Sequence, residues 1–220
     1  MAGRETEVEA ALLLDKGMSA LPNYLVCKIT NLNKYLNFYW RFKLAIIGII
    51  GKKGTGKTEC SKVLIQNYKF KKISFSDKLK EVICEVWDIP KTNLYDPTMK
   101  EKVDPRWGKS YREIMQLFGT EVCRVIHWDT WIYHVEKEFK SRTNESFVID
   151  DVRFKNEAEL IKKYGGILIK VVRPIIDSSD STHASEVEQD QIQPDIIIMN
   201  DSTKKDLHRK VEEALSYSLF

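Results

Sequence analysis

The sequence contains no long uninterrupted hydrophobic run. No apolar stretch reaches the roughly 18 residues that a membrane-spanning helix needs, because Lys28, Lys34, Arg41 and Lys43 interrupt the candidates. The first residues also lack a cationic segment followed by an apolar core, which a secretion signal requires. We therefore expect neither a membrane partner nor export.

Cysteine is scarce and the net charge is small. The four cysteines, at positions 27, 60, 84 and 123, form no C-x-x-C pair and have no histidine at metal-ligand spacing. This pattern is typical of a reduced intracellular protein, so we expect a cytoplasmic location. The formal net charge is +3, and the basic residues are interspersed with acidic ones. The charge therefore gives no indication of a nucleic-acid partner.

The composition is that of a globular protein. With 220 residues, 43% hydrophobic and 30% charged, the chain is long enough for one α/β domain with a full core and an appendage. Residues 1–42 show neither a helical nor a strand period over most of their length, and we treat them as an N-terminal extension of unknown role. They could be an added arm, a partner-binding segment, or sequence upstream of the natural start of the domain. The domain itself is expected over residues 43–220.

The strongest motif is a glycine-rich loop that directly follows an apolar run. Residues 44–58 read LAIIGIIGKKGTGKT, and the last eight match the phosphate-loop (P-loop) pattern G-x-x-x-x-G-K-[ST] without a mismatch. Glycines let the backbone curl so that successive N–H groups point inward at the start of a helix, whose dipole favours anions. We expect Lys57 to reach the outer phosphates of a nucleotide and the Thr58 hydroxyl to coordinate Mg²⁺. The expected nucleotide-binding residues are Gly51, Lys53, Gly54, Thr55, Gly56, Lys57, Thr58 and Asn200.

Strand-like and helix-like segments alternate along the rest of the chain. The expected strands cover 43–50, 71–75, 147–151, 167–173 and 195–199, and the expected helices cover 59–68, 76–87, 110–126, 130–140, 156–164 and 202–217. Ser76 or Asp77 is expected to cap the second helix. Residues 89–109 contain three prolines and many charges, and we expect them to be irregular. The alternation predicts a three-layer α/β fold, with a five-stranded parallel sheet covered by helices on both faces.

Polar residues follow each predicted strand at its carboxyl end, the edge where parallel sheets bind ligands. After the P-loop these residues are Ser76 and Asp77, then Asp151 and Arg153, then Arg173, and finally Asn200. We therefore predict the active site at this edge.

Several later blocks carry a family resemblance. They are SFSDKLK at 74–80, REIMQLFGTEVCR at 112–124, DDVRFKNEAELI at 150–161, VVRP at 171–174 and HASE at 183–186. Together with the P-loop, and over roughly residues 43–215, the sequence resembles the deoxynucleoside monophosphate kinases of tailed bacteriophages and large DNA viruses. The resemblance implies a P-loop NTPase fold with a helical monophosphate-binding region at 88–145 and a short lid at 175–193. It also suggests a homodimer.

The resemblance implies transfer of the γ-phosphoryl group of ATP, with Mg²⁺, to a small-molecule deoxynucleoside monophosphate. An acceptor phosphate with a second pKa of about 6 is already ionised near neutral pH, so the reaction needs alignment and positive charge rather than a general base. The expected catalytic residues are Lys57, Arg124, Asp151, Arg153 and Arg173, with Thr58 and Asp151 at the metal. The expected substrate-binding residues are Asp77, Lys80, Arg112, Gln116, Arg124 and Trp131.

Several of these assignments have alternatives. Asp150 is a rival of Asp151 for the metal, and Asp151 could instead cap a turn. Trp131 could stack on a base or belong to the core. Asn200 could meet the adenine edge or serve as a turn residue.

Two other functions remain open on the sequence. A weaker likeness to animal phosphomevalonate kinases allows another small-molecule kinase. The strand ending FVIDD also allows a P-loop ATPase or a nucleotide-binding regulatory protein, although the Asn-Lys-x-Asp and Asp-x-x-Gly motifs of GTPases are absent. The segment 175–193 is acidic, unlike the arginine-bearing lids of adenylate kinases, so lid closure is expected to depend on Arg173 at its base.

Overall fold

The computed structural model describes residues 45–174 and 188–218. The predicted N-terminal extension and most of the predicted lid lie outside the described residues. Within these two ranges, no helix is both long and apolar enough to cross a membrane.

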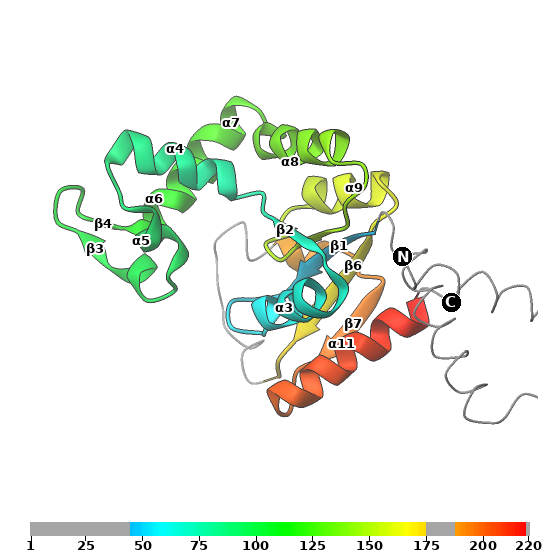
Figure 1. Ribbon diagram of the computed structural model, residues 1–220. Coiled ribbons are helices and arrows are strands. Elements are labelled where there is room, and N and C mark those ends of the chain that lie inside the picture. Colours follow the sequence, from blue (N-terminus) through cyan, green and yellow to red (C-terminus); the bar gives the residue numbers. More distant parts are fainter. Residues whose placement is uncertain (1–44, 175–187, 219–220) are drawn as a thin grey trace, which may run out of the picture. The chain divides into compact units, whose positions relative to one another are not determined.

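A five-stranded sheet lies at the centre of the described chain (Figure 1). Its strands are β1 Ile46–Ile50, β2 Lys71–Ile73, β5 Phe147–Ile149, β6 Ile167–Val172 and β7 Ile196–Met199. They pair in the order β2-β5-β1-β6-β7, and every pair is parallel. The central strand β1 is buried along its whole length, as its continuous apolar run requires. The five predicted strands are thus confirmed, each somewhat shorter than expected.

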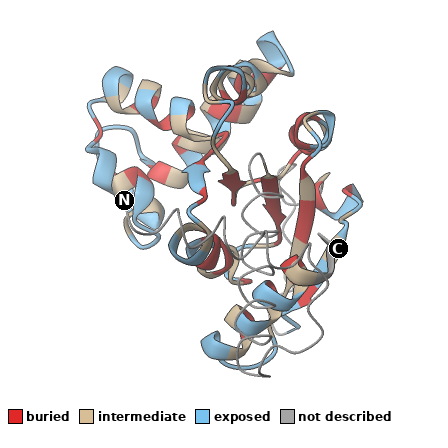
Figure 2. Cartoon of the chain, turned by 45° about the vertical axis from the view of Figure 1, so that its right-hand side comes forward, coloured by how far each residue is buried: buried red, intermediate tan, exposed pale blue. Residues whose placement is uncertain are grey.

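Helices cover both faces of the sheet. On one side α3 (Lys57–Tyr68) packs against β1, β2 and β5, while α11 (Lys204–Ser218) packs against α3 and β7. On the other side α9 (Lys155–Lys163) contacts β1 and β6, and α8 (Thr130–Ser141) packs on α9. Figure 2 shows the buried strands between these partly exposed helices. The three-layer prediction is therefore confirmed.

The chain between the second and third core strands, β2 and β5, forms a largely helical insert. After α4 (Asp77–Trp87) come α5 Lys91–Tyr95, the 3₁₀ turn η1 Met99–Glu101, strands β3 Val103–Asp104 and β4 Lys109–Ser110, and helix α6 Tyr111–Gln116. The expectation of an irregular segment at 89–109 is wrong, because short local bonds order it. Asp104 is buried and accepts hydrogen bonds from Arg106, and Ser110 and Glu113 form a capping box at the start of α6.

The helix predicted over 110–126 is interrupted by a π-helix. Segment η2, Leu117–Cys123, separates α6 from α7 Arg124–Ile126. Each π turn contains an extra residue, so the residues that follow it rotate away from the face that a regular helix would bury. Ile114, before the π-helix, is 5% exposed, whereas Val125, after it, is 79% exposed. Regular 3.6-residue periodicity therefore fails in this segment.

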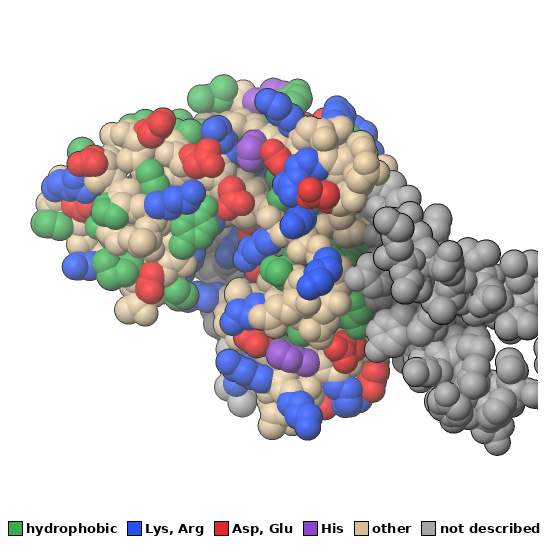
Figure 3. Space-filling model, viewed as in Figure 1, with side chains coloured by type: hydrophobic (Ala, Val, Ile, Leu, Met, Phe, Trp, Pro, Cys, Tyr) green, Lys and Arg blue, Asp and Glu red, His purple; other side chains and the backbone are tan. Residues whose placement is uncertain are grey.

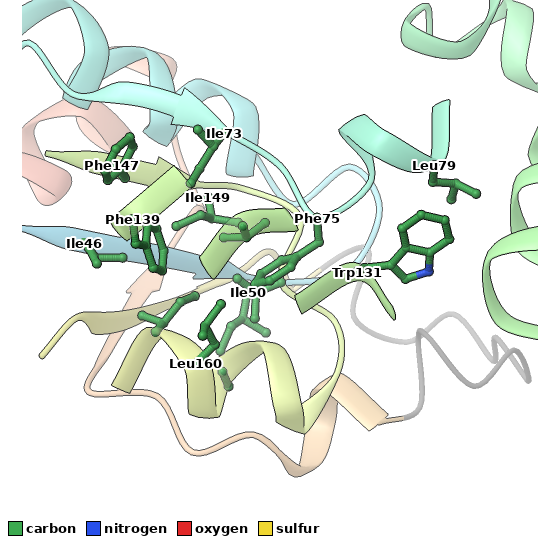
Figure 4. Close-up of a cluster of buried hydrophobic side chains, with 14 of the residues drawn as sticks. Ile46, Ile50, Ile73, Phe75, Leu79, Trp131, Phe139, Phe147, Ile149 and Leu160 are labelled. Carbon is green, nitrogen blue, oxygen red and sulfur yellow. The ribbon is translucent and has the colours of Figure 1, made fainter. Parts of the chain in front are cut away.

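The core extends from the sheet to the base of the insert (Figure 4). Ile50 and Ile149 from the strands lie close to Leu160 of α9. At the other end, Leu79 of α4 lies beside Trp131 of α8. This continuous cluster joins the sheet to the helices of the insert.

Candidate active site

The P-loop adopts the curled backbone that its glycines predict. Gly51, Gly54 and Gly56 have φ values of 150°, 83° and 109°, which disfavour residues with a side chain. A Cβ atom at Gly51 would lie 2.5 Å from the carbonyl oxygen of Val171, and one at Gly56 would lie 2.7 Å from Nδ2 of Asn200. The loop is thus seated closely between the ends of β6 and β7.

Lys57 folds back over the mouth of this loop. Its Nζ donates hydrogen bonds to the carbonyl oxygens of Gly51 and Lys52, the latter at 2.8 Å. Thr58 lies exposed in the first turn of α3, and the exposed Lys53 lies in the loop itself. Thr55 is fully buried and its hydroxyl donates to the Lys52 carbonyl oxygen at 2.9 Å.

Asn200 forms a hydrogen bond with the backbone of the P-loop. Its Nδ2 donates to the carbonyl oxygen of Thr55 at 2.8 Å, and its own backbone N–H donates to Val172. The amide nitrogen is therefore engaged in the loop backbone, whereas the sequence suggested a contact with adenine. The physical reason is that β7 ends beside the loop, so the first polar side chain after the strand meets loop backbone.

Asp151 holds the connection between β2 and α4. Its carboxylate accepts hydrogen bonds from the Phe75 amide at 3.2 Å, from the Ser76 amide at 3.0 Å and from the Ser74 hydroxyl. Burial raises the pKa of Asp151, but the positive charge of Lys80 and these hydrogen bonds outweigh it, so the pKa lies below the usual range. The carboxylate is thus kept ionised and is already engaged on the α4 side.

The neighbouring Asp150 faces α3 instead. Its Oδ2 accepts from the Ser61 hydroxyl at 3.0 Å and from Nζ of Lys72 at 2.7 Å, and the residue is 8% exposed. The sequence predicted that Asp151 lies near the metal, where it holds Mg²⁺ through water or positions substrate; in the structure its oxygens bond to Ser74, Phe75 and Ser76, just before α4. Asp150 is buried in an ion pair.

Lys100 and the three basic side chains whose charges act on it are here called the basic cluster. They are Lys80, Lys100, Arg112 and Arg153. Burial of Lys100 and the positive charges of the other three members lower the pKa of Lys100 to about 8, although the negative charge of Asp151 opposes this shift. Figure 3 shows Lys and Arg side chains around the hollow between the insert and the helices of the sheet. Such a concentration of like charge favours binding of an anion.

Lys100 was missed by the sequence reasoning. It lies in η1, within the segment expected to be irregular, and no motif distinguishes it from the neighbouring Lys102. Only the packing of η1 beside α6 brings it to the cluster.

Lys80 is held by aromatic and acidic neighbours. The residue is 7% exposed, and its Nζ lies 4.2 Å from the ring centroid of Tyr95 and 3.7 Å from Oδ1 of Asp77. The Tyr95 hydroxyl donates to the same Asp77 oxygen at 3.0 Å. Asp77 and Lys80 are thus brought together, and the Asp77 carboxylate contacts both Lys80 and Tyr95.

A carboxylate joins the P-loop to the insert. Oε1 of Glu101 accepts from Nζ of Lys53 at 2.7 Å and from Nε of Arg112 at 2.7 Å. Gln116 lies one turn beyond Arg112 on α6 and is half-buried, and Arg173 is exposed directly after β6. The P-loop and the basic cluster are therefore neighbours in space.

Arg124 does not reach this cluster. Its guanidinium group is 3% exposed, pairs with the equally buried Glu157, and lies 3.8 Å from the ring centroid of Phe154. The structure thus places Arg124 in a buried ion pair, whereas the sequence predicted that it binds substrate and acts in catalysis. The cause is the π-helix, after which α7 turns Arg124 toward the start of α9.

Trp131 lies in the core, one of the two positions that the sequence left open for it. Its indole is 7% exposed, and Nε1 donates to the carbonyl oxygen of Gly119 at 3.0 Å. The ring is buried in the core and its nitrogen has a hydrogen-bond acceptor inside the protein, so neither face of the ring is open to a base.

Comparison with known proteins shows the family of this chain. A family model described as deoxynucleotide monophosphate kinase matches residues 94–211. A protein of Acanthamoeba polyphaga mimivirus that carries this family's name is 34% identical over 183 residues, covering 76% of this chain and 94% of the relative. The deoxynucleotide monophosphate kinase of Enterobacteria phage T4 is 27% identical over 118 residues, covering 51% of this chain and 47% of that protein.

Among solved structures, shikimate kinase from Aquifex aeolicus is 13% identical, with a TM-score of 0.46 over 79% of this chain and 97% of that chain. That likeness is too weak to support an inference. The family match, in contrast, begins beyond the P-loop, so the P-loop motif and the family model are separate observations. This chain belongs to the deoxynucleotide monophosphate kinase family and is a phosphotransferase.

Proposed function

We propose that this enzyme transfers the γ-phosphoryl group of ATP to deoxynucleoside monophosphates, with Mg²⁺ as the metal. The observation that carries the proposal is the direct connection between two anion-binding features. Lys53 of the P-loop and Arg112 of the basic cluster both bond to one oxygen of Glu101. A triphosphate in the P-loop would therefore end close to a phosphate held by the cluster, the alignment that phosphoryl transfer needs.

The P-loop fits the donor nucleotide. Its three positive-φ glycines form a cradle that side chains would fill, and Lys57 can exchange its two carbonyl partners for phosphate oxygens. Within the described ranges, no three His, Cys, Asp or Glu side chains gather as a metal site. This is compatible with Mg²⁺ of the kinase type, which binds through substrate phosphates, water and one or two protein oxygens. Thr58 is the candidate protein ligand, and bound Mg²⁺ would neutralise charge on the phosphates.

The basic cluster fits the acceptor. Its four cations outnumber the three carboxylates beside them, Asp77, Glu101 and Asp151, so a positive excess is left that would favour a phosphate anion. Arg112 and Arg153 can each present a planar guanidinium group to phosphate oxygens, while Lys80 and Lys100 act as point charges. Gln116, on the same helix as Arg112, is a candidate contact for the sugar or the base.

The chemistry then requires no proton acceptor. An oxygen of the acceptor phosphate attacks the γ-phosphorus, the bond from that phosphorus to the β–γ bridging oxygen breaks, and ADP leaves with the electron pair. Lys57 and Arg153 would stabilise charge on the transferred group. Arg173, at the end of β6, is a further candidate for that role. Asp151 keeps α4 and hence Lys80 in place.

The test is an acceptor-dependence assay. The full chain is incubated with ATP, Mg²⁺ and, in separate reactions, each of the four deoxynucleoside monophosphates, phosphomevalonate or no acceptor, and ADP and the diphosphate product are both quantified. We expect equal amounts of the two products, dependent on at least one of the monophosphates. ADP release without an acceptor would indicate an ATPase. Turnover only with phosphomevalonate would indicate the other small-molecule kinase.

A further inference from the structure

Glu101 lies between the P-loop and the basic cluster. A single oxygen, Oε1, accepts hydrogen bonds from Lys53 of the P-loop and from Arg112 of α6, each at 2.7 Å. The side chains of Lys53, Glu101 and Arg112 are 62%, 48% and 26% exposed. The bridge is thus accessible to a ligand that approaches from solvent.

The two partners of Glu101 are cations that phosphate would also attract. A carboxylate oxygen with two N–H donors reproduces the contacts of a phosphate oxygen, since Lys and Arg bind both groups in the same way. Exposed ion pairs of this kind contribute little, so a phosphate with two negative charges can displace them. A carboxylate that remained beside bound phosphate would repel it.

We propose that Glu101 is a placeholder anion. In the ligand-free enzyme it holds Lys53 and Arg112 where substrate phosphates bind, and it releases at least one of them when phosphate arrives. The inference rests on the proposed function, because it takes phosphate as the ligand of both cations. It follows that Glu101 stabilises the ligand-free enzyme and thereby lowers its affinity for phosphate.

The test is the variant Glu101→Gln, which keeps the size of the side chain and removes its charge. Affinities for the four deoxynucleoside monophosphates and for pyrophosphate are measured by calorimetry, and KM and kcat by product formation. We expect binding about threefold to tenfold tighter, the range that one or two exposed ion pairs can supply. KM should fall by a similar factor with kcat nearly unchanged, as for a change in uniform binding. Unchanged or weaker binding would overturn the proposal.

Two comparisons make the result specific. Glu81→Gln is the matched control, because Glu81 is also 48% exposed and bonds to Lys78 at 2.8 Å on the surface of α4. It should leave every affinity unchanged. In a Lys53→Met background, Glu101→Gln should tighten binding less, because one of the two partners is already gone. An equal effect in both backgrounds would refute the bridge.

Thermal unfolding gives a readout that does not depend on turnover. Glu101→Gln should lower the melting temperature of the ligand-free enzyme, and saturating pyrophosphate should remove the difference. If the wild type fails to phosphorylate any monophosphate while the variant binds pyrophosphate more tightly, the proposed function fails and the placeholder stands. If the wild type turns over and the variant does not bind more tightly, the placeholder fails alone. If neither protein binds any phosphate, the placeholder fails as well.

Discussion

At the scale of single residues, the charged side chains of the site already have partners in the ligand-free enzyme. Lys57 bonds to loop carbonyl oxygens, Arg112 to Glu101, and Lys80 faces Tyr95 and Asp77. On the proposed function, substrate binding would therefore exchange these partners for phosphate rather than fill vacant donors. The free energy gained from each contact is the difference between the interaction with phosphate and the interaction with the group that phosphate replaces.

Lys57 should contribute mainly to the transition state. We expect Lys57→Ala to lower kcat by roughly 10²–10³-fold, the usual effect of removing one donor that stabilises developing charge. The fold should survive, because Lys57 is only half-buried and bonds to its own loop. Product formation and circular dichroism measure the two effects. Lys62→Ala on the same helix, where Lys62 is 53% exposed, should retain activity. Near wild-type turnover in Lys57→Ala would contradict the assignment.

Lys100 should make substrate binding sensitive to pH. Because burial and the neighbouring cations lower its pKa to about 8, Lys100 loses its positive charge as the pH rises through that value. A cation that binds phosphate is then lost, so KM for the monophosphate should rise between about pH 7 and pH 9, while kcat changes less. Lys100→Arg, which stays charged, should flatten this rise. An identical pH profile for KM in both proteins would show that another group titrates.

At the scale of elements, α7 holds the start of α9. Glu157 accepts hydrogen bonds from the backbone N–H groups of Arg153 at 2.8 Å and Phe154 at 3.1 Å, and its other oxygen pairs with Arg124. Burial raises the pKa of Glu157 to about 7, against the lowering effect of Arg124. The pair thereby fixes the backbone from which Arg153 projects.

Arg124 should therefore matter for stability first. We expect Arg124→Met to destabilise the protein by about 3–5 kcal/mol, because it leaves the Glu157 carboxylate buried without its partner. The double variant Arg124→Met with Glu157→Gln should recover part of the loss, since it carries no unpaired charge. Urea unfolding measures both. If Arg124→Met instead unfolds like the wild type but has lost turnover, Arg124 is catalytic and the structural assignment is wrong.

At the scale of the whole molecule, each parallel strand ends in a polar segment at the same edge of the sheet, and ion pairs hold the outer elements. Two carboxylates in these pairs have pKa values well below their usual range. Hydrogen bonds from Lys163 and Lys140 lower the pKa of Glu136 to about 2, and those from Arg106 lower the pKa of Asp104 to about 2. Glu136 thereby links α8 to α9, and Asp104 fastens the β3–β4 turn.

These two groups predict acid sensitivity of the fold. Their folded pKa values are depressed, so their contribution to stability is complete above the unfolded values of about 4–4.5 and is lost as the pH falls toward 2. We expect the loss of these two contributions to lower the melting temperature below about pH 4.5. Glu136→Gln should lower the melting temperature at pH 7 and make its fall in acid less steep. An unchanged slope would exclude a contribution from Glu136.

The sequence by itself determined the parts of this protein that depend on short-range pattern. Glycine spacing predicted the P-loop, because backbone curvature is a local property, and apolar runs predicted the five strands and their parallel pairing. The prediction that Lys80, Arg112, Arg124 and Arg153 share one site rested partly on this topology and partly on the family resemblance. In the structure the charges of Lys80, Arg112 and Arg153 act on Lys100, whereas Arg124 is buried against Glu157.

Only the tertiary structure decided how individual charges are used. Arg124 and Arg153 look alike in the sequence, yet one is buried against Glu157 and the other joins the basic cluster. Lys100 and Glu101 carry no motif and gain their roles only because η1 packs beside α6. The physical reason is that burial and ion pairing depend on contacts between segments far apart in the chain, which local periodicity does not encode.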